Sequence, residues 1–144
     1  MKVYEILKEK GNKVHCICPE ATVMDAVALL CGCNVGSLVV TDGTGAVKGI
    51  VTERDILRNV AAYSNNRIKV EDIMSKGVVI GLPDDDIENI MKVMTQKRVR
   101  HLPIMNKGKL AGLISIGDVL KSLQDEKDAK IRYLENYISS GYLA

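Results

Sequence analysis

The chain contains the same passage twice. Residues 49–57 read GIVTERDIL and residues 112–120 read GLISIGDVL, which is an offset of 63 positions. Upstream, residues 35–40 correspond to residues 99–104 at an offset of 64. Copies of one passage at such a spacing indicate two supersecondary units, each of which needs its neighbour to bury an apolar face. The drift in the offset indicates small changes in loop length between the copies.

Each copy predicts the order strand, helix, strand, strand, helix. Short runs rich in Val and Ile favour strands, whereas apolar residues spaced three or four apart favour helices. Thr22 is a candidate helix N-cap, and Asp25 is its capping-box partner. The predicted helices begin near residues 22, 56, 86 and 117, and the predicted strands are 14–17, 38–41, 47–52, 78–80, 101–105 and 109–115.

The predicted fold class is α/β (α+β), with two β-α-β-β-α repeats packed through small three-stranded sheets and clefts between the repeats. The polar segment 63–69 is the predicted linker. Spaced apolar residues such as Leu134 and Ile138 predict a further helix that lies over the core or over a partner subunit. The predicted boundaries are 1–66 for the first repeat with an N-terminal helical segment, 67–123 for the second repeat and 124–144 for the C-terminal helix.

The composition limits the classes of function. Of 144 residues, 47% are apolar, 20 are Lys or Arg and 18 are Asp or Glu, which gives a net charge of +2. No concentrated basic stripe is present, which argues against a nucleic-acid partner. The apolar runs are too short to span a membrane, and residues 1–5 lack the pattern of a signal peptide. We therefore expect a cytoplasmic protein with no membrane partner.

The repeated passage carries a hydroxyl residue followed three positions later by an aspartate, as Thr52 with Asp55 and Ser115 with Asp118. Such a pair at a helix start can be a capping box, which needs no ligand. The same geometry also presents free N–H groups to an anion. A carboxylate one turn later can accept hydrogen bonds from ribose hydroxyls. The two interpretations are compatible, and the repetition favours the second.

The whole chain resembles a tandem pair of cystathionine β-synthase (CBS) domains, which is called a Bateman module. The motifs are VEDIM at 70–74, RVRHLPIM at 98–105 and GLISIGDVL at 112–120. The resemblance implies that an adenine nucleotide binds in the clefts between the repeats, with Ser or Thr on a phosphate and Asp on the ribose. It also implies phosphate contacts from basic residues before the apolar strand, here Arg100 and His101.

The first copy departs from this pattern, because Gly36 and Ser37 stand in place of the two basic residues. Arg54 and Arg58, one helical turn apart, either lie in solvent or supply the missing charge. We therefore expect the second site to favour AMP or ATP, and the first to be weaker or to take a dinucleotide. The candidate nucleotide-binding residues are Thr52, Arg54, Asp55, Arg100, His101, Ser115, Gly117 and Asp118.

These features predict a sensor or regulatory module for AMP, ADP, ATP or NAD, with no obligatory cofactor. No pattern of nucleophile and general base is visible, so we expect no enzyme activity. A ligand that bridges the two units would stabilise one arrangement through its differential affinity and so signal to an effector protein. Apolar helix faces predict a homodimer; they include Ile56, Leu57, Val119 and Leu120.

Other classes of function remain open on the sequence. The cysteines form the pairs Cys16-x-Cys18 and Cys31-x-Cys33, which suits either a metal or redox site or four small core residues. Zinc ligands are usually separated by two to four residues rather than one, which favours core residues. The chain could also be an enzyme that acts on nucleotides, or a scaffold whose nucleotide sites are vestigial.

Overall fold

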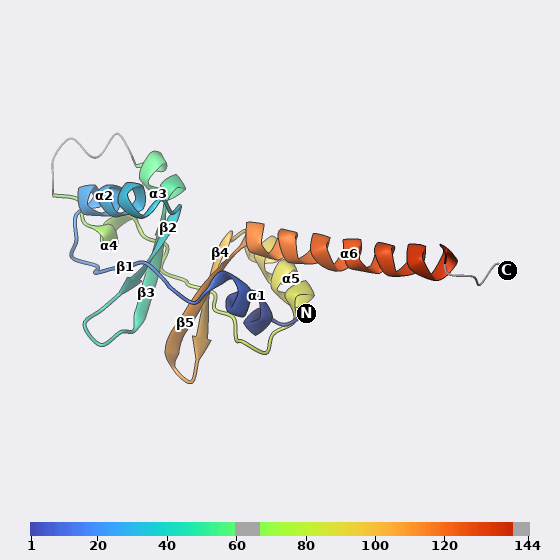
Figure 1. Cartoon of the computed structure of the whole chain (residues 1–144). Coiled ribbons are helices and arrows are strands. Elements are labelled where there is room, and N and C mark those ends of the chain that lie inside the picture. The colour runs from blue at the N-terminus through green and yellow to red at the C-terminus, as the bar shows by residue number, and fades with distance from the viewer. Residues whose placement is uncertain (60–66, 140–144) are drawn as a thin grey trace.

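The computed structural model describes residues 1–59 and 67–139. Figure 1 shows two units side by side, each a small sheet with helices against it, and a long helix that extends away from both. The mixed α/β fold predicted from the sequence is confirmed. The first unit holds β1 (Cys16–Ile17), α2 (Val23–Cys33), β2 (Ser37–Thr41), β3 (Val47–Thr52), α3 (Glu53–Arg58) and α4 (Val70–Ile73). The second holds α1 (Val3–Lys10), α5 (Ile87–Lys97), β4 (His101–Asn106), β5 (Lys109–Ser115) and α6 (Ile116–Ser139).

Both units are built around an antiparallel pair of strands in the same register. β2 pairs with β3 so that Ser37 faces Thr52, and β4 pairs with β5 so that His101 faces Ser115. In each copy the hydroxyl residue therefore ends the second strand, opposite the residue that begins the first. The following residue starts a helix, α3 in the first unit and α6 in the second.

The prediction of a third strand at 78–80 in the second unit is wrong. In this described segment only Gly81 pairs with β4, where it donates to the Pro103 carbonyl and accepts from the Met105 N–H, both at 2.9 Å. Extending this parallel pairing by one step requires an N–H from Pro103 on one side and from Pro83 on the other. Proline has no N–H, so the pairing is restricted to a single bridge.

The helices that precede the two repeats are exchanged between the units. Val3 and Ile6 of α1 lie in the core of the second unit, and Val70 of α4 lies in the core of the first. Matching backbone hydrogen bonds hold them, from the Val3 N–H to the Asp85 carbonyl at 3.0 Å and from the Val70 N–H to the Ala21 carbonyl at 2.8 Å. Each core is therefore completed by a helix from the other half of the chain.

A glycine in the last strand of each unit allows the exchanged segment to approach closely. A Cβ on Gly112 would lie 2.6 Å from the side chain of Leu7 in α1, and a Cβ on Gly49 would lie 2.7 Å from the backbone oxygen of Ser75, just after α4. The backbones of Ser75 and Ile50 also exchange two hydrogen bonds, at 2.9 and 3.1 Å. The glycine that opens each repeated passage is thus a packing requirement.

The predicted helix starts agree to within one residue with those of α2, α5 and α6, but not with that of α3. Thr22 accepts a hydrogen bond from the Asp25 N–H at 3.1 Å, and the Asp25 carboxylate accepts from the Thr22 N–H at 3.0 Å, so the predicted capping box is confirmed. Because Thr52 caps α3, this helix begins directly after it, earlier than the predicted residue 56. Residue 60, part of the same predicted helix face, lies outside the described residues.

The C-terminal region is a single helix. α6 runs without a break from Ile116 to Ser139, so the last helix of the second repeat and the separate C-terminal helix that we predicted are continuous. The boundaries at 66/67 and 123/124 stay predictions. Across residues 1–59 and 67–139, no helix combines the length and the apolar character needed to cross a membrane.

Candidate functional site

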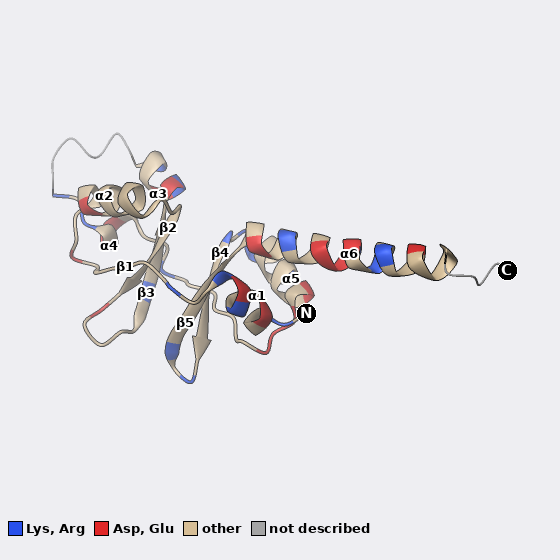
Figure 2. Ribbon diagram, in the orientation of Figure 1, with Lys and Arg blue, Asp and Glu red and all other residues tan. Residues whose placement is uncertain are grey.

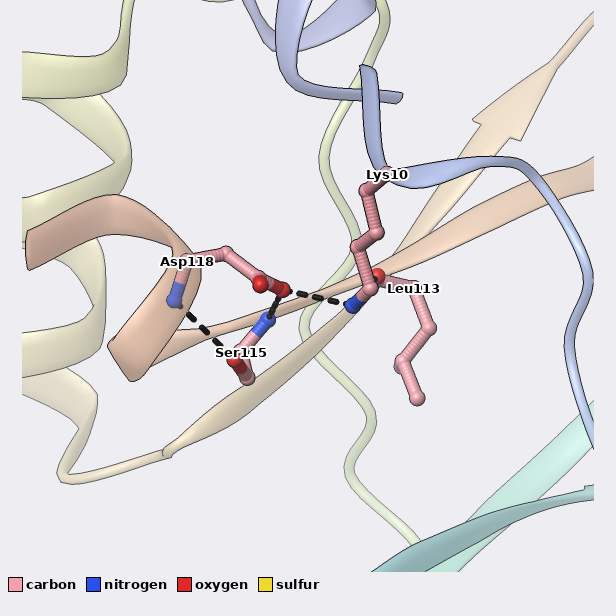
Figure 3. Close-up of polar contacts among 4 residues, drawn as sticks. All are labelled: Lys10, Leu113, Ser115 and Asp118. Atoms are coloured by element: carbon pink, nitrogen blue, oxygen red, sulfur yellow. Dashed lines mark hydrogen bonds and ion pairs between the residues drawn. The ribbon is translucent and has the colours of Figure 1, made fainter. Parts of the chain in front are cut away.

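The repeated hydroxyl–aspartate pair forms the same local structure in both units. Ser115 Oγ accepts from the Asp118 N–H at 3.1 Å, and Asp118 Oδ2 accepts from the Ser115 N–H at 2.9 Å (Figure 3). The corresponding distances between Thr52 and Asp55 are 3.2 and 2.9 Å. The capping-box interpretation is therefore confirmed in both copies. The cap also fixes each carboxylate in the first turn of its helix.

The first turn of α6 keeps one backbone donor available. The Ile116 N–H donates to the Arg100 carbonyl at 2.8 Å, and the Asp118 N–H is taken by Ser115. Within the described part of the chain, the N–H of Gly117 between them has no acceptor. A free N–H at the start of a helix of 24 residues lies at the positive end of the helix dipole, where an anion is favoured.

Lys10, which the sequence analysis missed, belongs to the same site. Its ammonium lies 2.5 Å from Asp118 Oδ2 and 2.9 Å from the Leu113 carbonyl oxygen (Figure 3). Burial alone would raise the pKa of Asp118, but hydrogen bonds from Lys10 and from the Ser115 N–H outweigh burial and hold this pKa below its ordinary value. No local pattern marks Lys10, because Asp118 lies 108 positions further along the chain.

His101 faces Ser115 across the strand pair, in the position where the family resemblance implies a phosphate contact. Burial lowers the pKa of His101 from its ordinary 6.5, and the charge of Lys10 lowers it further, whereas nearby carboxylates such as Glu53 oppose the shift. The imidazole is therefore neutral near pH 7 and can donate a hydrogen bond without adding a full charge.

The first unit carries an acidic group where the second carries a basic one. A Cβ on Gly36 would lie 3.5 Å from Glu53 Oε1, so this carboxylate lies beside the position that corresponds to the exposed Arg100. Arg54 and Arg58 are both exposed on α3, which favours their interpretation as solvated side chains. The two junctions therefore share their caps and differ in their surrounding charge.

The prediction that the cysteines fill the core is wrong. They are all free thiols, half-buried at Cys33 and exposed at Cys16, Cys18 and Cys31. The apolar stripe of α2 follows Ala26 and Leu30 and leaves Cys31 to one side. No three side chains of His, Cys, Asp or Glu gather as a metal site requires, in the residues that the structure describes.

The two exchanged, capped units define a tandem-repeat α/β protein, and comparison with known proteins identifies its family. The family model for the CBS domain matches residues 3–62 and 70–125. The chain therefore belongs to the CBS domain family and carries two CBS domains in tandem, as the motifs implied.

A relative from a plant supports this assignment. "CBS domain-containing protein CBSX3, mitochondrial" of Arabidopsis thaliana is 33% identical over 151 residues, which cover 97% of this chain and 73% of that protein. Because this relative is named as mitochondrial, the cytoplasmic location of the present chain stays a prediction.

Solved structures agree with the fold. The CBS-domain containing protein ATU1752 from Agrobacterium tumefaciens has a TM-score of 0.81 and 37% identity, over 85% of this chain and 98% of that one. The CBS domain protein PAE2072 from Pyrobaculum aerophilum, solved as a complex with AMP, has a TM-score of 0.75 and 25% identity, over 87% of this chain and 99% of that one.

Proposed function

We propose that this protein is a regulatory module that binds an adenine nucleotide at the junction between β5 and α6. The observation that carries the proposal is the grouping of an aspartate, a hydroxyl and a free helix N–H beside basic side chains. Asp118 and Ser115 supply the first two, and Gly117 supplies the N–H. The AMP complex of the related protein PAE2072 supports an adenine nucleotide as the ligand class.

Each group has a role that its chemistry suits. The Asp118 carboxylate is ionised at neutral pH because its pKa is lowered, so it can accept hydrogen bonds from the two ribose hydroxyls. The Ser115 hydroxyl and the Gly117 N–H are donors for a phosphate oxygen. Arg100 is exposed next to β4 and offers a guanidinium that can bind phosphate through two hydrogen bonds.

The proposed output is a change of arrangement rather than a reaction. Because Lys10 of α1, from the first half of the chain, contacts Asp118 in the second half, a ligand at the junction lies beside elements from both halves of the chain. Binding then shifts the population of the two-unit arrangement by the difference in affinity between its states. An effector protein would read that shift, and no catalytic step is required of Asp55 or Asp118.

We also propose that the active form is a homodimer. Of the described apolar residues that predicted it, Val119 is buried and Ile56 packs on its own core, but Leu57 and Leu120 are 71% and 53% exposed. Val60, on the same predicted face as Leu57, lies outside the described residues. Leu57 borders an apolar groove between α2 and α3 that Val27 also lines. Acidic and basic residues follow one another along the part of α6 that extends away from both units (Figure 2). The same part of α6 also exposes the apolar residues Ile131, Leu134 and Ile138.

Light scattering at micromolar concentration tests the dimer. We expect the mass of two chains for the wild type and of one chain for Leu57→Glu. Leu82→Glu is the matched control, because Leu82 is 52% exposed but does not line the groove. A monomeric wild type contradicts the dimer.

Calorimetric titration tests the nucleotide. AMP, ADP, ATP and NAD are titrated separately into the wild type and into Asp118→Asn, which keeps the size of the side chain and removes its charge. We expect at least one ligand to bind the wild type and to bind the variant about tenfold or more weakly, because a hydrogen bond to a charged group contributes about 1.5–3 kcal/mol. A wild type that binds none of the four ligands supports a scaffold with vestigial sites.

A further inference from the structure

We propose that Lys10 makes the second site selective for nucleotides over nucleosides. In the empty site the Lys10 ammonium forms an ion pair with Asp118. When the ribose of a nucleotide displaces the ammonium from Asp118, the ammonium binds the phosphate of the same ligand instead. This inference rests on the proposed function, and it assigns Lys10 a role in ligand selection. The evidence is the position of Lys10, which closes α1 in sequence but lies over the junction of β5 and α6 in space (Figure 3).

The ion pair uses the same carboxylate that the ribose requires. Asp118 Oδ2 accepts from Lys10 at 2.5 Å and from the Ser115 N–H at 2.9 Å. A ribose that offers two hydroxyls to this carboxylate competes with Lys10 directly, whereas the Ser115 N–H belongs to the helix cap and stays in place. Ribose binding at Asp118 therefore requires the ammonium to move.

Lys10 can move without unfolding its helix. Its side chain is 39% exposed, and α1 is held to the second unit through Val3 and Ile6 rather than through Lys10. Lysine carries its charge on a flexible four-carbon stem with three rotatable donors. A rotation about the side-chain bonds is thus enough to release the carboxylate while α1 stays packed.

The charge of the ligand decides whether that rotation is favourable. A nucleoside takes Asp118 and leaves the ammonium without its carboxylate partner. A nucleotide takes Asp118 and supplies a phosphate anion, to which the displaced ammonium can donate a charge-assisted hydrogen bond. The neutral His101 cannot replace this charge at pH 7. The competition with Lys10 therefore weakens the binding of adenosine more than the binding of AMP.

The first unit carries a glycine at the position that corresponds to Lys10. With the offset of 67 that relates Val3 to Val70, Lys10 corresponds to Gly77, which has no side chain to reach Asp55. α4 also ends at Ile73, whereas α1 continues to Lys10 itself. The selection by charge that we propose therefore concerns the second unit, where Lys10 contacts Asp118.

The test is the ratio of the dissociation constants for adenosine and AMP, measured by calorimetry at one pH and salt concentration. Lys10→Met keeps the length of the side chain and removes its charge, and Lys10→Arg restores a charge. Lys8→Met is the matched control, since Lys8 is an exposed lysine of the same helix. We expect the wild type, Lys8→Met and Lys10→Arg to prefer AMP by about tenfold or more, the effect of one charged hydrogen bond.

In Lys10→Met we expect AMP to bind more weakly and adenosine to bind as well as or better than in the wild type. The ratio therefore falls by about tenfold or more, and the preference for AMP that remains comes from Arg100, Ser115 and Gly117. Adenosine binding that appears only in Lys10→Met also supports the competition. A ratio that is unchanged in Lys10→Met, with normal AMP binding, overturns the role of Lys10 and leaves the proposed function intact. If neither adenosine nor any of AMP, ADP, ATP and NAD binds the wild type or Lys10→Met, both proposals fail.

Discussion

The two halves of the molecule are alike in backbone and unlike in charge. Thr52 with Asp55 and Ser115 with Asp118 form equivalent caps, with hydrogen bonds that agree within about 0.1 Å. Around them, the second unit adds Lys10 and the first adds a glutamate. Both units thus need the cap for the stability of the repeat. The charged residues around the cap can differ between the units, and they determine which ligand each unit binds. A shared motif in this protein therefore predicts a shared structure and does not by itself predict a shared affinity.

The largest difference in stability is expected at the strand glycines. In Gly49→Ala the new Cβ meets the backbone oxygen of Ser75, which is itself hydrogen-bonded and cannot retreat. In Gly112→Ala it meets only the flexible end of Leu7. Overpacking typically costs about 1–3 kcal/mol, so we expect Gly49→Ala near the top of this range and Gly112→Ala near the bottom. Urea denaturation of both variants measures which one loses more free energy of unfolding. Equal losses in the two variants would show that the two contacts are equally rigid.

The caps are expected to contribute equally. Thr52→Ala and Ser115→Ala each remove the acceptor of one helix N–H, at a cost of about 1 kcal/mol. Thr95→Ala is the control, because its hydroxyl bonds a carbonyl within α5 and caps nothing. Denaturation midpoints that fall by similar amounts for the two cap variants confirm the comparison. A much larger effect at one cap would mean that the two junctions differ in structure as well as in charge.

A smaller difference is expected in the response to pH, because only the second unit has a histidine at the start of its first antiparallel strand. The folded pKa of His101 is below its ordinary 6.5, so in acid the unfolded chain binds a proton before the folded chain does. The stability contributed by neutral His101 is complete above pH 6.5 and is lost as the pH falls through the folded pKa.

Thermal melts between pH 7.5 and pH 5 check this window. We expect His101→Gln to lose less stability than the wild type over that interval, and His15→Gln to follow the wild type. An identical slope for His101→Gln and the wild type would show that His101 does not carry the acid sensitivity.

Much of the fold can be predicted from the sequence, because the repeated passage is also the repeated structure. Strands 47–52 and 109–115 were predicted with the bounds that they have as β3 and β5, since alternating apolar residues and a capped helix start are local signals. The prediction of a strand at 78–80 was wrong for a reason that lies elsewhere in the chain. Pro103 is on the neighbouring strand β4 and has no N–H to donate to residues 78–80.

The site was predictable only in part. Ser115 and Asp118 are marked by their spacing, but Lys10 is one of several lysines near the N-terminus and reaches the site through the exchange of α1. Long-range packing of this kind leaves no periodic trace in the chain. The prediction that the cysteines are buried was wrong because it relied on residue type alone. The apolar face of α2 buries Ala26 and Leu30, and Cys31 lies outside that face.

The central claim is that the second junction is the tight nucleotide site and the first is weak or serves another ligand. Titration of AMP into the wild type, Asp118→Ala and Asp55→Ala tests it most directly, after each variant is shown to be folded by circular dichroism. We predict that Asp118→Ala removes the tighter binding phase and that Asp55→Ala preserves it. Loss of the tight phase in Asp55→Ala alone would reverse the assignment, and binding that is unchanged in both variants would reduce the aspartates to helix caps.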